Sequence, residues 1–140
     1  MNARPAGVSR RRFLEGAAAF TVAAGLGGLR LATLGASSST DPVERLASLL
    51  THRSSAAAFG REVLRERPAE ASAAVLLAAL RSTVPDLDRL VRAGSDDDLR
   101  AAIDAASRRD FAVGGDAILR VRGWVVATTE ARLCALAAVA

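Results

Sequence analysis

Between residues 42 and 109, apolar residues recur every three or four positions, and a proline, a glycine or a capping residue interrupts the pattern at short intervals. Such spacing places the apolar side chains on one face of each helix. Pro42, Pro68, Pro85 and Gly94 stand where helices should begin or end. A chain of short, one-sided helices buries its apolar faces by packing them together, so the pattern predicts a mainly α, small helical domain.

We expect five to six helices in this domain. The clearest starts are Asp41, which precedes Pro42, and Ser95, which has Asp98 three residues later in the arrangement of a capping box. The segment 69–82 is nearly apolar in its middle, so it is predicted to lie at the centre of the core. The expected helices span about 42–50, 55–67, 69–82, 85–93, 95–109 and 129–139.

The helical pattern stops at Gly114, and the following residues are rich in β-branched side chains. Arg120 and Arg122 alternate there with apolar residues, which is typical of a strand. We therefore predict a short β-hairpin at about 117–126, with its turn near Gly123, before the C-terminal helix. The two arginines are expected to share one strand face, which either is solvated or holds an anionic group.

Trp124 is the only tryptophan in the chain and directly follows the predicted turn. A buried indole contributes a large apolar surface and needs a partner for its N–H group. We expect Trp124 to pack on the helices as part of the core. The alternative is an exposed anchor, in which case Arg120, Arg122 and Trp124 form a partner-binding surface.

The N-terminal stretch Ser9-Arg10-Arg11-Arg12-Phe13-Leu14 is followed by a mild apolar run, 16–29. Ser9, Arg10, Arg11, Phe13 and Leu14 match the patterned positions of the twin-arginine export signal, which this stretch resembles. The resemblance implies recognition by the twin-arginine translocase and a periplasmic or other extracytoplasmic location. The apolar run is shorter than the roughly 20 residues that span a bilayer.

We expect cleavage near Ala36, although Leu34-Gly35-Ala36 matches a cleavage site only loosely. This divides the chain into a signal peptide at 1–36, a linker at 37–41 and the helical domain at 42–140. The alternative is an uncleaved signal that anchors the protein in the membrane. Membrane contact is expected only through this segment.

The charge distribution argues against a nucleic-acid partner. The whole chain carries a net charge of +4, but its first 36 residues contain five of the 19 basic residues and one of the 15 acidic residues. The rest of the chain therefore carries equal numbers of basic and acidic residues, 14 of each. Because the excess belongs to the export signal, we expect no nucleic-acid binding by the helical domain.

No grouping of residues predicts catalysis, a metal or a cofactor. His52 is the only histidine, and the Asp96-Asp97-Asp98 run lacks the spacing of a calcium loop, so helix capping is the preferred interpretation. Cys134 is the only cysteine, so it forms no disulfide within the chain and is expected to be a small buried residue. We therefore expect a protein that is not an enzyme.

Two further resemblances bear on function. Residues 123–136, with Asp110-Phe111 ahead of them, are similar to the C-terminal end of a group of small twin-arginine-exported bacterial proteins without assigned activity. Ala127 stands where the predicted C-terminal helix, 129–139, would be expected to have a capping side chain. In layout, the chain resembles the small helical subunits that accompany periplasmic flavin dehydrogenases and supply their export signal.

The layout implies an exported, non-enzymatic accessory or binding subunit that escorts a larger periplasmic oxidoreductase. The alternative is a stand-alone small exported or membrane-anchored protein with a structural or stress role.

Overall fold

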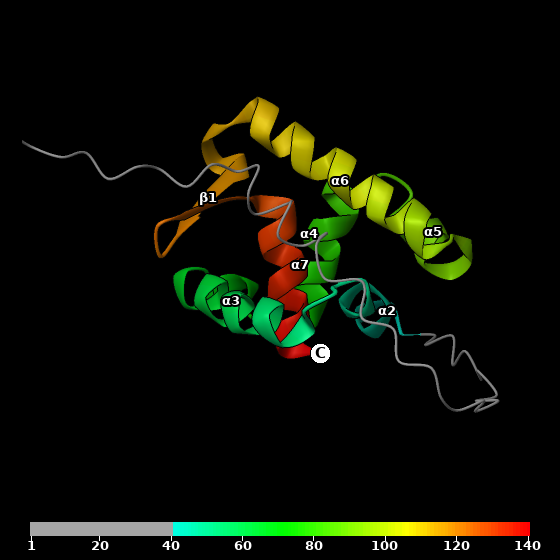
Figure 1. Ribbon diagram of the computed structural model, residues 1–140, viewed down its shortest axis with the longest axis horizontal. Helices are drawn as coiled ribbons and strands as arrows, with labels where there is room; N and C mark the ends of the chain where they lie inside the picture. Colours follow the sequence, from blue (N-terminus) through cyan, green and yellow to red (C-terminus); the bar gives the residue numbers. More distant parts are fainter. Residues whose placement is uncertain (1–40) are drawn as a thin grey trace, which may run out of the picture. The chain divides into compact units, whose positions relative to one another are not determined.

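The computed structural model describes residues 41–140 (Figure 1), and the predicted export signal, with Ser9, Arg10, Arg11, Phe13 and Leu14, lies outside them. Six α-helices and one two-stranded hairpin form the described part, with the hairpin directly before the last helix, which confirms the predicted fold class. The elements are α2 (Pro42–Ser48), α3 (Arg53–Glu66), α4 (Ala73–Thr83), α5 (Leu87–Ala93), α6 (Asp96–Val113), β1 (Ile118–Val121), β2 (Trp124–Ala127) and α7 (Thr128–Val139), with single 3₁₀ turns at Pro68–Glu70 and Gly115–Ala117.

The central element is α7, which packs against α2, α3, α4 and α6 (Figure 1). Its residues Ala131, Ala135 and Leu136 are completely buried. Alanine side chains let neighbouring helices approach from several sides at once. The prediction that 69–82 would be central is wrong, because α4 buries only part of its surface and leaves Val75 44% exposed.

Close contact between α3 and α7 depends on Gly60, which lies in the middle of α3 and is buried. A Cβ atom at this position would lie 2.5 Å from the carbonyl carbon of Cys134 and 2.8 Å from the Cα atom of Ala135. Both distances are shorter than any normal contact, so the backbones of the two helices meet at this glycine.

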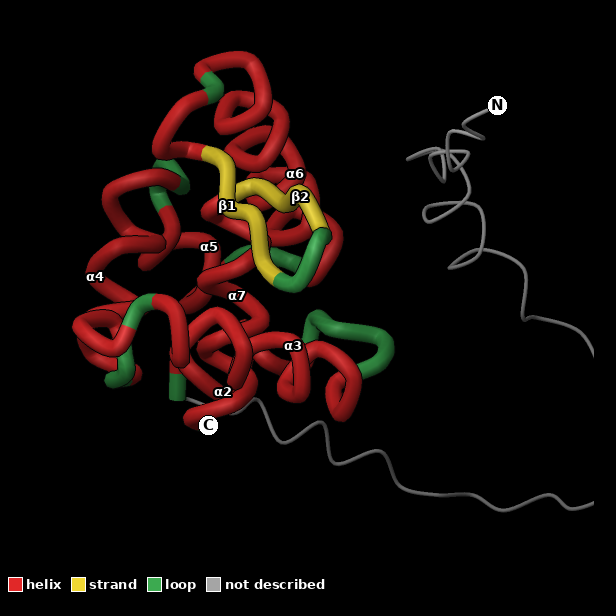
Figure 2. Tube along the Cα trace, turned by 90° about the vertical axis from the view of Figure 1, so that its left-hand side faces the viewer, coloured by secondary structure: helices red, strands yellow, loops and turns green. Residues whose placement is uncertain are grey.

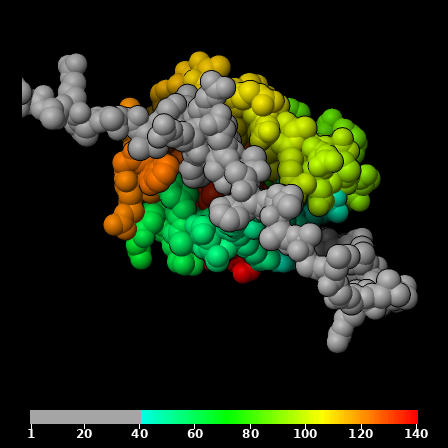
Figure 3. All heavy atoms as spheres, viewed as in Figure 1, coloured from blue at the N-terminus to red at the C-terminus, as the bar shows by residue number. Residues whose placement is uncertain are grey.

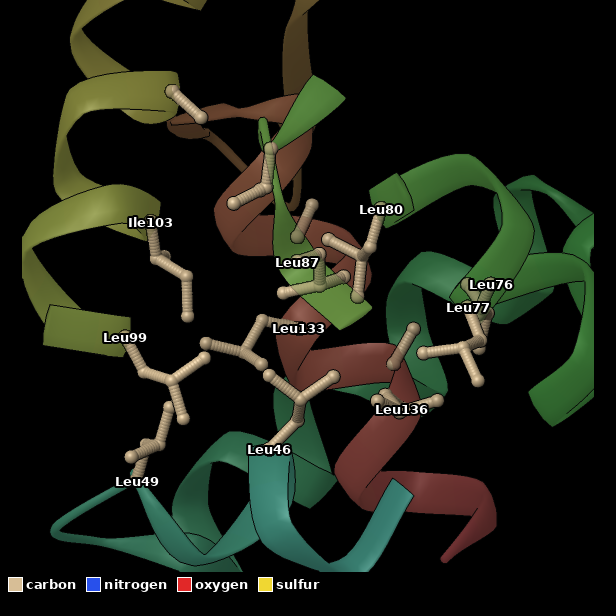
Figure 4. Close-up of a cluster of buried hydrophobic side chains, with 14 of the residues drawn as sticks. Leu46, Leu49, Leu76, Leu77, Leu80, Leu87, Leu99, Ile103, Leu133 and Leu136 are labelled. Carbon is tan, nitrogen blue, oxygen red and sulfur yellow. The ribbon is translucent and has the colours of Figure 1, made fainter. Parts of the chain in front are cut away.

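Leucines from five of the helices fill the space around α7 (Figure 4). Leu46, Leu76, Leu80, Leu99 and Leu136 are at most 1% exposed. Each fully buried leucine contributes about 1.5–3 kcal/mol through removal of its surface from water. The core is therefore aliphatic, with leucine as its main side chain.

Several helix starts were predicted correctly. The Asp41 carboxylate accepts a hydrogen bond from the Val43 N–H at 3.0 Å, and the Ser95 hydroxyl and Asp98 carboxylate form the expected reciprocal capping box. Other helix ends differ from the sequence prediction. The α4 helix starts at Ala73, because Ser72 caps it and a 3₁₀ turn follows Pro68, while α6 continues four residues beyond Arg109 to Val113.

The α3 helix starts at Arg53, two residues before the predicted Ser55. The side chain of Arg53 donates two hydrogen bonds to the Glu44 carboxylate, at 2.5 and 2.8 Å. This bidentate pair joins the first turn of α3 to α2. The extension of the helix thus depends on a contact with another element.

A second bidentate ion pair joins the 3₁₀ turn after α3 to α7. The guanidinium of Arg132 donates to both oxygens of Glu70, at 2.9 and 3.0 Å, and Arg67 donates a third hydrogen bond at 3.1 Å. The side chains of Glu70 and Arg132 are only 16% and 18% exposed. Mainly because Arg132 donates to it, the pKa of Glu70 lies below its ordinary value.

The hairpin has the predicted turn. β1 and β2 pair antiparallel, and the register places Val121 opposite Trp124 on either side of a two-residue loop. Both loop residues have positive φ, 48° at Arg122 and 83° at Gly123. Two consecutive residues with positive φ match the right-handed twist of a hairpin, and Gly123 adopts this conformation without steric cost.

Candidate partner-binding site on the hairpin

The two faces of the hairpin follow from its register. Leu119 and Val121 on β1 face the same way as Val126 and Trp124, which pair with them on β2. Leu119 is 8% exposed and Val121 is fully buried, so this is the face toward the helices. Arg120 and its partner Val125 lie on the opposite face and are exposed.

Trp124 lies at the turn end of the inward face and is 54% exposed. The prediction that it belongs to the core is therefore wrong, although its strand and face were as expected for a core residue. The reason is its position: the turn of the hairpin lies at the edge of the helical domain, beside α3 (Figure 1, Figure 2). About half of the indole surface remains accessible there.

Arg122 does not share a strand face with Arg120, because it belongs to the turn. Its guanidinium lies 3.4 Å from the Glu62 carboxylate on α3, and Glu62 also accepts a hydrogen bond from Arg65 at 2.5 Å. The hydrogen bond from Arg65 is the main reason that the pKa of Glu62 is lowered. The Glu62 carboxylate thus forms ion pairs with two arginines beside the hairpin turn.

Arg120 is exposed and has no ion pair among residues 41–140. Together with Trp124 and the 37% exposed Val125, it forms what we call the hairpin patch: Arg120 and Val125 on the outward face and Trp124 on the inward face, at the turn end. The hairpin lies at the molecular surface, as its orange atoms in Figure 3 show. The patch combines an aromatic ring, an aliphatic side chain and an uncompensated positive charge.

Two hydrogen bonds join the segments that precede the hairpin to the helix that follows it. The Asp110 carboxylate on α6 accepts from the backbone N–H of Thr129 at 2.8 Å, and the Thr128 hydroxyl donates to the Asp116 carbonyl at 3.2 Å. Asp110 therefore supplies the N-terminal cap that Ala127 lacks. A cap from another helix leaves no local signal in the sequence, so Asp110 stood out there only as part of a resemblance.

The other predicted site residues do not come together. His52 is an exposed residue at the N-cap of α3, and the Asp96–Asp98 run forms the first turn of α6. Cys134 on α7 is partly buried, and the pKa of its thiol is raised to about 11, chiefly by burial and secondarily by Glu130. Within residues 41–140, no three His, Cys, Asp or Glu side chains are grouped as metal ligands would be.

A polar hollow lies over α5, where Arg81, Arg89 and Arg92 alternate with two acids. Arg81 binds Asp88 at 2.9 Å, and Arg89 lies 3.4 Å from Asp86. Two of its three positive charges are thus already compensated, in contrast to Arg120. None of the helices in the described part is long and apolar enough to cross a membrane.

Comparison with known proteins gives no match: no family model fits the chain, and neither the curated proteins nor the solved structures include one with significant similarity to it.

Proposed function

We propose that this protein is an exported, non-enzymatic binding subunit that escorts a larger periplasmic oxidoreductase through the twin-arginine pathway. The observation that carries the proposal is the exposure of Trp124, a side chain that contributes more apolar contact area than any other type when it is covered. Tryptophan and arginine are the residue types that most often dominate the energy of protein interfaces. The hairpin patch holds one of each.

The export motif supports the other part of the proposal, which is transport together with a partner. Ser9-Arg10-Arg11-Arg12-Phe13-Leu14 has the pattern of a signal read by a translocase that transports folded proteins. A small helical domain has little need of folded export for itself, whereas a partner loaded with a flavin or haem does. Export together with such a partner explains why this chain has a twin-arginine motif.

The test is export of the pair from cells that produce this chain with the oxidoreductase of its own gene neighbourhood. Replacing Arg10 and Arg11 together by Lys should leave both proteins in the cytoplasm. A matched variant, Arg4→Lys, changes an arginine outside the motif and should not affect export. Immunoblots of the cytoplasmic and periplasmic fractions measure both outcomes.

Export of the oxidoreductase that is independent of this chain would contradict the escort role. If the chain itself is exported normally but purifies alone, the stand-alone alternative is favoured. Export that survives deletion of the translocase would contradict the interpretation of the signal.

A further inference from the structure

We infer that the hairpin patch recognises an acidic segment of the partner protein, with Arg120 binding a carboxylate while Trp124 and Val125 cover apolar side chains next to it. This inference rests on the proposed function, since it names the chemistry of the partner's surface.

The charges around the turn are out of balance. Arg65, Arg120 and Arg122 carry three positive charges, and among residues 41–140 only Glu62 forms ion pairs with any of them. Arg65 and Arg122 share this carboxylate, so it neutralises only one of the two, and Arg120 adds a further uncompensated charge. A partner surface with acidic side chains would restore the balance and be favoured in the encounter.

The apolar part of the patch explains why a free anion is a poor candidate. Trp124 and Val125 are among the few large apolar side chains of residues 41–140 that are more than one third exposed. An inorganic anion would leave both uncovered. A peptide segment with alternating acidic and apolar side chains satisfies the arginine and also removes this apolar surface from water.

The register places these groups within reach of one short segment. Arg120 and Val125 are directly opposite each other across the two strands on the outward face, and Trp124, the chain neighbour of Val125, points to the inward face. In a hairpin with a two-residue loop, the pair next to the turn exchanges backbone hydrogen bonds, so the next pair, Arg120 and Val125, points its backbone groups outward. An extended segment that lies beside β2 therefore binds the backbone of Val125 and directs its alternate side chains to the two faces of the hairpin, acidic ones toward Arg120 and apolar ones toward Trp124.

The test uses the full chain and two synthetic eight-residue peptides, one alternating valine with glutamate and one alternating valine with lysine. Trp124 is the only tryptophan and the chain contains no tyrosine, so its fluorescence reports directly on the patch. We expect the glutamate peptide to shift the emission to shorter wavelength and to bind about tenfold more tightly than the lysine peptide. Salt should weaken this binding.

Arg120→Glu should abolish the preference for the glutamate peptide. Arg92→Glu is the matched control, because Arg92 is an exposed arginine on α5, at the opposite side of the molecule from the hairpin in Figure 1. It makes the same change of charge and should keep the preference. Circular dichroism and the emission of each variant without peptide show that both are folded.

Equal affinity for the two peptides, no binding of either, or an unchanged preference in Arg120→Glu would overturn the inference. Self-association would also overturn it. In that case the emission would shift with protein concentration in the absence of peptide, and sedimentation would show a dimer, because a second copy would cover the patch. None of these results depends on export. Co-export with an oxidoreductase despite a failed peptide test would leave the proposed function standing.

Discussion

Asp110 shows how a single side chain can join two helices of this domain. Its carboxylate lies on α6 and binds the Thr129 N–H at the start of α7, 19 residues further along the chain. The first N–H groups of a helix have no partner inside it, and a negative charge there is favoured by the helix dipole. Asp110 therefore stabilises the start of the central helix without belonging to it.

Replacing Asp110 by Ala should lower the free energy of unfolding by about 1–2 kcal/mol, because the helix start loses its capping group. Asp104→Ala is the control, since Asp104 is an exposed residue of the same helix. Urea denaturation followed by circular dichroism measures both. Equal stability of the two variants would contradict the capping role.

Cys134 is a second single residue whose environment can be tested. The pKa of its thiol is about 11 in the folded protein against an ordinary value of 9.0, because burial disfavours the thiolate. The folded state therefore holds this proton more tightly, so the associated stability is fully present below pH 9 and is lost as the pH rises toward 11.

We expect iodoacetamide to label the folded protein much more slowly at pH 8 than the urea-unfolded protein, because the thiolate is the reactive species. Cys134→Ala should lose less stability than the wild type between pH 9 and 11. Mass spectrometry of the labelled protein and melting at each pH provide the measurements. Rapid labelling of the folded chain would show that the thiol is neither buried nor shifted.

At the scale of elements, the packing of α3 on α7 depends on the absence of a side chain at Gly60. In an isolated helix, alanine is favoured over glycine by about 1 kcal/mol. Here an added Cβ would lie 2.8 Å from the Cα of Ala135, which is backbone and cannot move aside on its own. The contact between the helices therefore makes glycine more favourable than alanine at this position.

Gly60→Ala should therefore destabilise the domain by about 1–3 kcal/mol or more, since the helices must separate. Ala58→Ser on the exposed side of the same helix should change the stability by less than about 0.5 kcal/mol. Thermal melting compares the two. A melting temperature of Gly60→Ala at or above that of the wild type would show that α3 and α7 are further apart than described.

At the scale of the whole molecule, Glu70 joins segments that are 62 residues apart through its bidentate pair with Arg132. Its lowered pKa means that the folded state favours the carboxylate. The stability from this interaction is therefore present above the ordinary pKa of 4.5 and is lost as the pH falls through the lower, folded-state value.

Glu70→Gln should lower the stability at pH 7 by about 1–3 kcal/mol, because charge-assisted hydrogen bonds are replaced by weaker ones. The difference from the wild type should shrink below pH 4, where the wild-type carboxylate also becomes protonated. Glu66→Gln removes an exposed carboxylate from the end of α3 and is the control. A constant difference between pH 7 and pH 3 would contradict the assigned pKa shift.

Features that a few neighbouring residues control were predictable from the sequence alone. The Asp41 cap, the Ser95 capping box and the turn at Gly123 were predicted correctly, because caps and turns act over two to four residues. The helical class followed from the spacing of apolar residues. Arg120, Arg122 and Trp124 were named as an alternative partner-binding surface from their residue types alone, and this surface stays a prediction.

The packing of the folded domain sets which helix is central, where α3 begins and how far Trp124 is covered. These depend on contacts between residues distant in sequence, such as Asp110 with Thr129 and Glu70 with Arg132. The burial of a side chain is set by the elements that pack over it, and the helices of residues 41–140 leave Trp124 54% exposed at the turn end of the hairpin. Residue type and strand face were therefore insufficient to predict the exposure of Trp124.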